Sequence, residues 1–144
     1  MDLKDYIESI PGFPKEGIIF RDVTPILQNA KAMRYCVDQL NAFVKEVGAD
    51  IIVAPEARGF LFGVPVALES GIGFIPVRKP GKLPRETVNE SYDLEYGQDE
   101  LCVHADAILP GQKVVIVDDL LATGGTVEAI IKMVERMQAS VTGV

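Results

Sequence analysis

The sequence has few of the residues on which metal centres and disulfide frameworks depend. Its 144 residues include two cysteines, one histidine and no tryptophan. Cys36 and Cys102 lie in unrelated segments without C-x-x-C spacing, so we expect two free thiols and a reducing, cytoplasmic environment. His104 is distant in sequence from every motif described below, and we expect it to be structural.

A long apolar run is also missing. The apolar stretches have the length of strands, or are interrupted by glycine, proline and charged residues, so we expect no membrane-spanning segment. The first ten residues carry acidic side chains and no apolar core, so we expect no secretory signal there. With 48% hydrophobic and 24% charged residues, the composition predicts one globular domain over residues 1–144.

The balance of charge argues against a nucleic-acid partner. Fourteen basic and 21 acidic residues give a net charge of −7, which leaves no broad basic surface. Four cations nevertheless fall within eight residues, namely Arg78, Lys79, Lys82 and Arg85. Such a cluster on an acidic protein suits a small polyanionic ligand, and a solvated basic loop is the alternative.

Hydrophobic periodicity predicts alternating helices and strands. We expect helices over 31–47 and 125–138. A third helix would follow a loop at 55–59 and continue to about residue 70. We expect strands over 50–54, 73–77, 88–96, 101–108 and 113–117, and a further strand starting in 139–144, with 97–99 turning the chain between the third and fourth.

This order is typical of an α/β fold, a mostly parallel twisted sheet flanked by helices. Ligands bind such sheets beyond the carboxyl ends of the strands, where the loops 55–59, 78–87 and 118–126 would lie. The hairpin and the N-terminal segment do not follow the alternation, and we expect them to form a small hood.

The most informative segment is Val114–Thr126, which reads VVIVDDLLATGGT. A buried strand leads into two adjacent acids, a loop of small residues and a helix. The backbone N–H groups of the Ala122–Thr126 turn and the start of the helix would bind a phosphate, to which Gly124 and Gly125 permit close approach. A ribose on that phosphate would present its hydroxyls to the acids. The alternative is a plain strand–turn–helix junction capped by aspartate.

This segment resembles the fingerprint of the type I phosphoribosyltransferases, and its finer match is to the adenine phosphoribosyltransferase family. Four other segments agree in order with that family: Gly17–Pro25 (GIIFRDVTP), Glu56–Gly63 (EARGFLFG), Arg78–Pro84 (RKPGKLP) and Ser91–Gly97 (SYDLEYG). The resemblance covers nearly the whole chain from about residue 10. It also implies a further strand and tail after Val144, so that this single domain would be shortened at its C-terminal end.

The resemblance implies roles for residues that would bind phosphoribosyl pyrophosphate. Asp118 and Asp119 would hold the ribose diol, and Arg58, on a loop that often contains a non-proline cis peptide, would clamp the pyrophosphate. The 5-phosphate would be bound by Ala122, Thr123, Gly124, Gly125 and Thr126. The 78–87 loop would close over the site with Arg78, Lys79 and Lys82. Mg²⁺ would be held mainly through the substrate, with no direct protein ligand.

It also implies how a purine would be bound. Phe20 and Leu120 would sandwich the ring, although an aromatic residue and a leucine in apolar company are usually core. The backbone of Ile19 and Arg21 would read the edge of adenine. Glu95 would face N7 of the base as the acid–base residue, in either protonation state.

The activity implied is transfer of the phosphoribosyl group from phosphoribosyl pyrophosphate to adenine, giving AMP and pyrophosphate in purine salvage, by a cytoplasmic homodimer. Another purine (hypoxanthine, guanine or xanthine) is one alternative substrate. A non-catalytic regulator that senses phosphoribosyl pyrophosphate is another. The chain has no appended nucleic-acid module and retains the basic loop and Arg58, which favours an enzyme.

Overall fold

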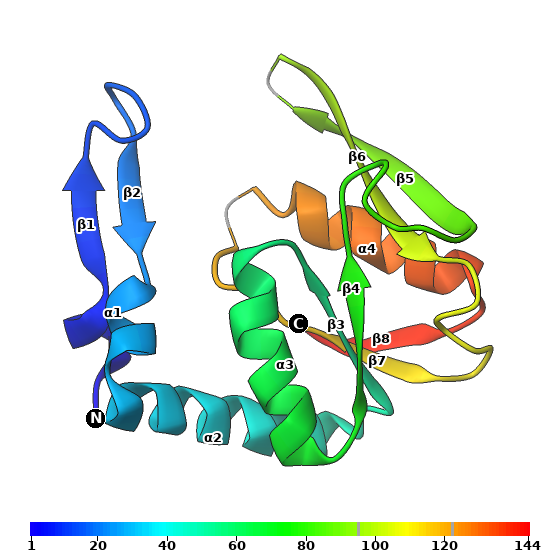
Figure 1. Ribbon diagram of the computed structural model, residues 1–144, viewed down its shortest axis with the longest axis horizontal. Coiled ribbons are helices and arrows are strands. Elements are labelled where there is room, and N and C mark those ends of the chain that lie inside the picture. The colour runs from blue at the N-terminus through cyan, green and yellow to red at the C-terminus, as the bar shows by residue number, and fades with distance from the viewer. Residues whose placement is uncertain (95, 122) are drawn as a thin grey trace. The chain divides into compact units, whose positions relative to one another are not determined.

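The computed structural model describes residues 1–94, 96–121 and 123–144 (Figure 1). Two predicted site residues, Glu95 and Ala122, therefore lie outside the described residues. The chain divides into two compact units, residues 1–40 and residues 41–144. Among the described residues, none of the helices has both the length and the hydrophobicity needed to cross a bilayer.

The first unit is built around a short pair of strands. Its elements are η1 (Leu3–Tyr6), β1 (Glu8–Pro11), β2 (Ile19–Asp22), α1 (Thr24–Gln28) and most of α2 (Ala30–Val47). The strands β1 and β2 are antiparallel, with Ser9 opposite Arg21. The periodicity over 31–47 correctly predicted α2. It missed β1 and β2, because four residues are too few to establish an alternating pattern.

The second unit contains a four-stranded sheet, whose strands are β3 (Ile51–Pro55), β4 (Gly73–Val77), β7 (Lys113–Ile116) and β8 (Ser140–Gly143). Their order is β4-β3-β7-β8, and every neighbouring pair is parallel. The predicted parallel sheet is confirmed. The order places β3, β4 and β7 side by side, so the segments that follow these strands begin at one edge of the sheet.

Helices pack on both faces of this sheet. On one face, Val53 belongs to a buried cluster with Ile130 and Val134 of α4 (Gly125–Arg136). On the other face, α3 (Arg58–Ser70) approaches through Gly63, where an added Cβ would lie 2.8 Å from the ring of Phe74. The sequence predicted this α/β layering, and burial of each such aliphatic side chain contributes about 1.5–3 kcal/mol.

The helix α4 differs in detail from the prediction over 125–138. It ends at Arg136, and Gln138 has a left-handed backbone with φ of 63°. Ile130 and Val134 are fully buried, and Ala129 and Met133 join them. Three further apolar residues of this segment pack only at the margin of the core: Val127, Ile131 and Met137.

The hairpin consists of β5 (Thr87–Leu94) and β6 (Gly97–His104), and the predicted turn at 97–99 was wrong. Gly97 already pairs with Leu94 as the first residue of β6, and its φ of 103° favours glycine. The strand predicted over 101–108 is present with other bounds, since β6 begins at Gly97 and ends at His104. At its other end the hairpin joins β4 through two hydrogen bonds between the backbones of Arg78 and Cys102.

Candidate functional site

The carboxyl ends of β3, β4 and β7 surround a cavity of about 240 Å³. Because these parallel strands are neighbours, the segments that follow them converge there. The lining residues are Pro55, Glu56, Arg58, Lys79, Tyr92, Leu101, Asp118, Asp119, Leu120 and Thr126. The predicted residues Arg58, Lys79, Asp118, Asp119, Leu120 and Thr126 are thus brought together by the fold.

Two adjacent carboxylates follow β7. The backbone N–H of Asp119 donates to Asp118 Oδ1 at 2.8 Å. The side chain of Asp119 is only 6% exposed, and its Oδ2 lies 2.9 Å from Arg58 Nε in an ion pair without hydrogen-bond alignment. The pKa of Asp118 is raised to about 6, mainly by burial. The neighbouring Asp119 side chain also raises it, by more than the cation of Arg58 lowers it.

This pKa predicts an unusual pH dependence of stability. Because the pKa of Asp118 is higher in the folded chain, its stabilising contribution is present below about pH 4 and lost as the pH rises through about 6. Asp118→Asn is therefore expected to raise the free energy of unfolding at neutral pH by about 1 kcal/mol, after allowance for solvent screening of this half-buried group. The melting temperature should rise by about 2–4 °C.

Urea denaturation at several pH values between about 4 and 8 measures this effect. Asp93→Asn, which removes an exposed carboxylate of the hairpin, is the matched control. The gap between wild type and Asp118→Asn should open between about pH 4 and 6 and stay constant at higher pH. A gap that does not change with pH would contradict the raised pKa.

The small-residue loop forms a second hollow of about 70 Å³, which adjoins the first. Thr123, Gly124 and Gly125 line it, and Asp118, Leu120 and Thr126 line both hollows. Gly124 precedes α4 with a φ of 87°, a conformation that favours glycine. The first N–H groups of α4 have no partner within the helix, so this loop has the geometry of an anion site.

The Arg58 segment is helical where the sequence predicted a loop over 55–59, since α3 begins at Arg58 itself. The Glu56–Ala57 peptide is cis, as the resemblance implied for this segment. Sequence reasoning missed the role of Glu56, whose Oε1 accepts hydrogen bonds from Lys79 N at 2.7 Å and from Arg78 Nε at 3.2 Å. The sequence could have indicated this contact, because Glu56 directly follows β3, and Arg78 and Lys79 directly follow its parallel neighbour β4.

The four cations of the 78–87 segment do not act as one cluster. Lys79 lines the cavity, and Arg78 contacts Glu56 beside it. Lys82 is exposed and does not line the cavity. Arg85 forms an ion pair with Asp106 at 2.8 Å and contacts His104 Nδ1 at 3.2 Å. In the described part of the chain, the basic run therefore supplies the cavity mainly through its first two residues.

Lys79 has two further partners that the sequence did not reveal. Its Nζ forms an ion pair with Asp99 and lies 3.3 Å from Tyr92 Oη. Tyr92 and Asp99 are directly opposite each other in the hairpin. Only the pairing of β5 with β6 places them together, and the misplaced turn had concealed it.

The residues predicted to bind the base lie in different units. Ile19, Phe20 and Arg21 are on β2, where Phe20 packs edge-on against Phe13 at 5.2 Å and Arg21 donates to Ser9 Oγ. Leu120 is 44% exposed at the cavity of the second unit. The sandwich of a purine between Phe20 and Leu120 remains a prediction.

Comparison with known families agrees with this arrangement. The model of the phosphoribosyl transferase domain matches residues 24–143. The chain belongs to the phosphoribosyl transferase domain family. Within this family it is 60% identical over 141 residues to the adenine phosphoribosyltransferase of Alkaliphilus oremlandii, covering 98% of the chain and 82% of that relative.

Solved structures of phosphoribosyl transferase relatives share the fold. Adenine phosphoribosyltransferase from Thermoanaerobacter pseudethanolicus superimposes with a TM-score of 0.93 at 56% identity, over 96% of this chain and 81% of that one. The enzyme from Saccharomyces cerevisiae, in complex with an imino-altritol bisphosphate and adenine, has a TM-score of 0.93 at 42% identity, with the same two coverages. The predicted fold class is confirmed.

Proposed function

We propose that this chain transfers the 5-phosphoribosyl group of phosphoribosyl pyrophosphate to adenine, giving AMP and pyrophosphate in purine salvage. The observation that carries the proposal is a pair of adjoining hollows, one lined by Arg58, Lys79 and two adjacent carboxylates and the other by the small-residue loop. This set matches a substrate with a phosphate at one end, a diol in the middle and a pyrophosphate at the other. Relatives named adenine phosphoribosyltransferase, at 60% identity, support adenine as the acceptor.

In this proposal the loop Thr123–Thr126 binds the 5-phosphate through its N–H groups and hydroxyls. Asp118 and Asp119 accept hydrogen bonds from the ribose diol, and these bonds are strongest when both carboxyls are ionised. Arg58 and Lys79 bind the pyrophosphate, with Arg78 and Lys82 nearby in sequence. The bond from C1 to the pyrophosphate oxygen breaks, and the bond to N9 of adenine forms. Fixed cations beside the leaving group stabilise its charge without reorganisation.

The base completes the reaction by losing the proton of its imidazole ring. We assign acid–base assistance at N7 to Glu95, from its place in the Ser91–Gly97 motif, and ring contacts to Phe20 and Leu120. The backbone groups of Ile19 and Arg21 recognise the edge of the base. Ala122, outside the described residues, carries no side-chain group that could take over the role of Glu95.

The residues of the cavity fit Mg²⁺. Asp118 and Asp119 supply carboxylate oxygens, which are hard ligands of the kind that Mg²⁺ prefers and which also accept hydrogen bonds from its water ligands. A bound pyrophosphate supplies further oxygen ligands. We propose that Mg²⁺ is held mainly through substrate oxygens, without a direct protein ligand. When bound, it neutralises charge on the pyrophosphate.

We also propose a cytoplasmic homodimer. Cys36 and Cys102 are buried and free, which suits a reducing compartment. Three apolar side chains at helical spacing are exposed on α3, namely Leu61 at 46%, Val64 at 47% and Leu68 at 82%. A second copy of the chain could bury this stripe. Sedimentation velocity tests the proposal, and a monomer at all concentrations would contradict it.

A base-by-base assay tests the proposed function. Purified chain with phosphoribosyl pyrophosphate and Mg²⁺ is expected to consume adenine, followed by its change in ultraviolet absorbance, with much lower kcat/KM for hypoxanthine, guanine and xanthine. Preference for another of these purines would replace adenine as the acceptor. Binding of phosphoribosyl pyrophosphate without turnover on any base would instead indicate a sensor.

A further inference from the structure

The ammonium group of Lys79 already has an anionic partner within the protein. The backbone of Lys79 is held by Glu56, and its Nζ is held by the carboxylate of Asp99. The same Nζ lies 3.3 Å from Tyr92 Oη and 5.7 Å from the centre of that ring. A substrate anion that binds Lys79 therefore meets a cation whose charge is compensated.

The carboxylate of Asp99 is positioned by the hairpin. Tyr92, its cross-strand partner, donates from Oη to Asp99 Oδ2 at 3.2 Å. The backbone N–H of Glu100 donates to Asp99 Oδ1 at 2.9 Å. The hydrogen bond from Lys79 lowers the pKa of Asp99 in spite of partial burial. Burial would lower the pKa of Lys79, but its bonds to Asp99 and Tyr92 raise it, so both groups stay charged.

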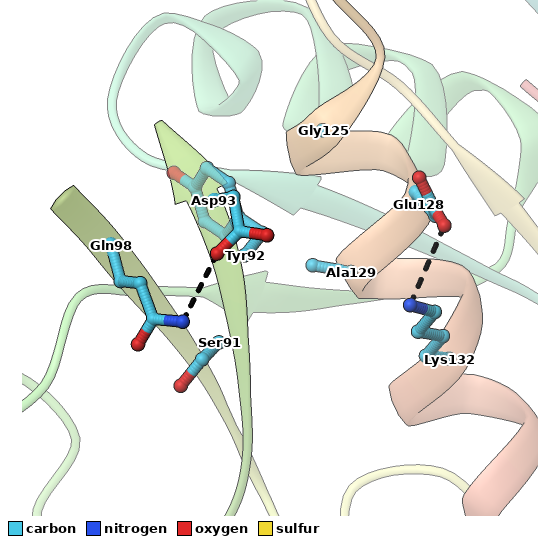
Figure 2. A pocket seen from close by; sticks show the side chains of 8 residues that line it. All are labelled: Ser91, Tyr92, Asp93, Gln98, Gly125, Glu128, Ala129 and Lys132. Atoms are coloured by element: carbon cyan, nitrogen blue, oxygen red, sulfur yellow. Dashed lines mark hydrogen bonds and ion pairs between the residues drawn. The ribbon is translucent and has the colours of Figure 1, made fainter. Parts of the chain in front are cut away.

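The ring of Tyr92 connects this pair to the rest of the site. It lines the substrate cavity and also a polar groove of about 320 Å³ between the hairpin and α4. A Cβ added to Gly125 would lie 3.3 Å from Tyr92 Cδ2, so the ring rests against the start of α4. Figure 2 shows Tyr92 with Asp93 and Gln98 on the hairpin side, opposite Glu128 and Lys132 of α4.

We propose that Asp99 is an internal counter-ion of Lys79, which the pyrophosphate group of the substrate must displace in order to bind that lysine. This inference rests on the proposed function, in which Lys79 binds pyrophosphate. Asp99 lowers the affinity for the anion by occupying Lys79. It also regains Lys79 when pyrophosphate leaves, which favours release.

Asp99→Asn tests the proposal because asparagine keeps an oxygen for the Glu100 N–H and loses the charge. Isothermal titration with inorganic pyrophosphate and Mg²⁺ is expected to show binding about two- to fivefold tighter than wild type, the range of a partly exposed ion pair. The gain should shrink at high salt. Asp93→Asn is the matched control: it removes the same charge from the same hairpin, where Asp93 accepts from Gln98 at 3.0 Å and not from Lys79.

A double-mutant cycle with Lys79→Met decides whether Asp99 acts through Lys79. In the Lys79→Met background, Asp99→Asn is expected to change pyrophosphate affinity no more than Asp93→Asn does. Unchanged or weaker binding by Asp99→Asn alone, or an equal gain in both backgrounds, would overturn the counter-ion role. If wild type binds no pyrophosphate, the proposed function itself fails, a result distinct from the failure of Asp99 alone.

Discussion

Replacing Asp118 and Asp119 together with asparagine is expected to lower kcat/KM for phosphoribosyl pyrophosphate by about 10²–10⁴-fold. Each carboxylate would accept a hydrogen bond from one ribose hydroxyl, and a hydrogen bond to a charged group is worth about 1.5–3 kcal/mol. Steady-state kinetics at neutral pH measures the loss, and circular dichroism checks the fold. We expect the fold to survive because asparagine at 118 can still accept from the backbone N–H of residue 119.

The double variant Asp93→Asn with Asp106→Asn is its control. It removes two carboxylates from the same unit, and neither lines the substrate cavity. Asp106 is instead paired with Arg85 on the exposed surface. Wild-type kcat/KM in the control and a large loss in the site variant would support the diol-binding role. Unchanged kcat/KM in the site variant would remove that role from both aspartates.

Glu95→Leu is expected to lower kcat by about 10²–10⁴-fold, the usual contribution of general acid–base catalysis. The glycosidic bond forms at N9, so the imidazole ring of the base must lose a proton as the bond develops. Glu95 is the carboxyl that the family resemblance places at N7. The dissociation constant of phosphoribosyl pyrophosphate should barely change, because we assign its contacts to other segments.

Single-turnover kinetics with adenine separates the chemical step from product release. Glu95→Gln keeps the shape of the side chain and removes its ionisation, so it should be impaired as well. Glu100→Gln, in the neighbouring strand β6, serves as the matched control with near wild-type kcat. A loss below about tenfold for Glu95→Leu would show that the carboxyl has no acid–base role.

Most regular elements of the second unit could be predicted because its central strands are short apolar runs and its helices are long enough to establish a period. The strand β4 appears where hydrophobic spacing placed it, and so does the helix α2, most of which lies in the first unit. The errors lie at junctions. The start of β6 at Gly97 and the start of α3 at Arg58 depend on backbone conformations of one or two residues, which periodicity does not report.

The sequence by itself determined the chemistry available to the site. That chemistry comes from local patterns: two adjacent acids after an apolar strand, the small-residue loop and the basic run. Each pattern consists of residues that are close together in the sequence, so it can be recognised without the fold. They predicted a phosphate, a diol and a polyanion as ligands before any contact was known.

Only the tertiary structure decided which of these groups compensate one another. Glu56 with Arg78, Arg58 with Asp119, and Lys79 with Asp99 are pairs between segments far apart in the sequence. The strand order and the hairpin register bring them within contact, and both are set by the packing of the sheet, the helices and the hairpin. Burial, which raises the pKa of Asp118 to about 6, likewise depends on what the fold places around a carboxyl.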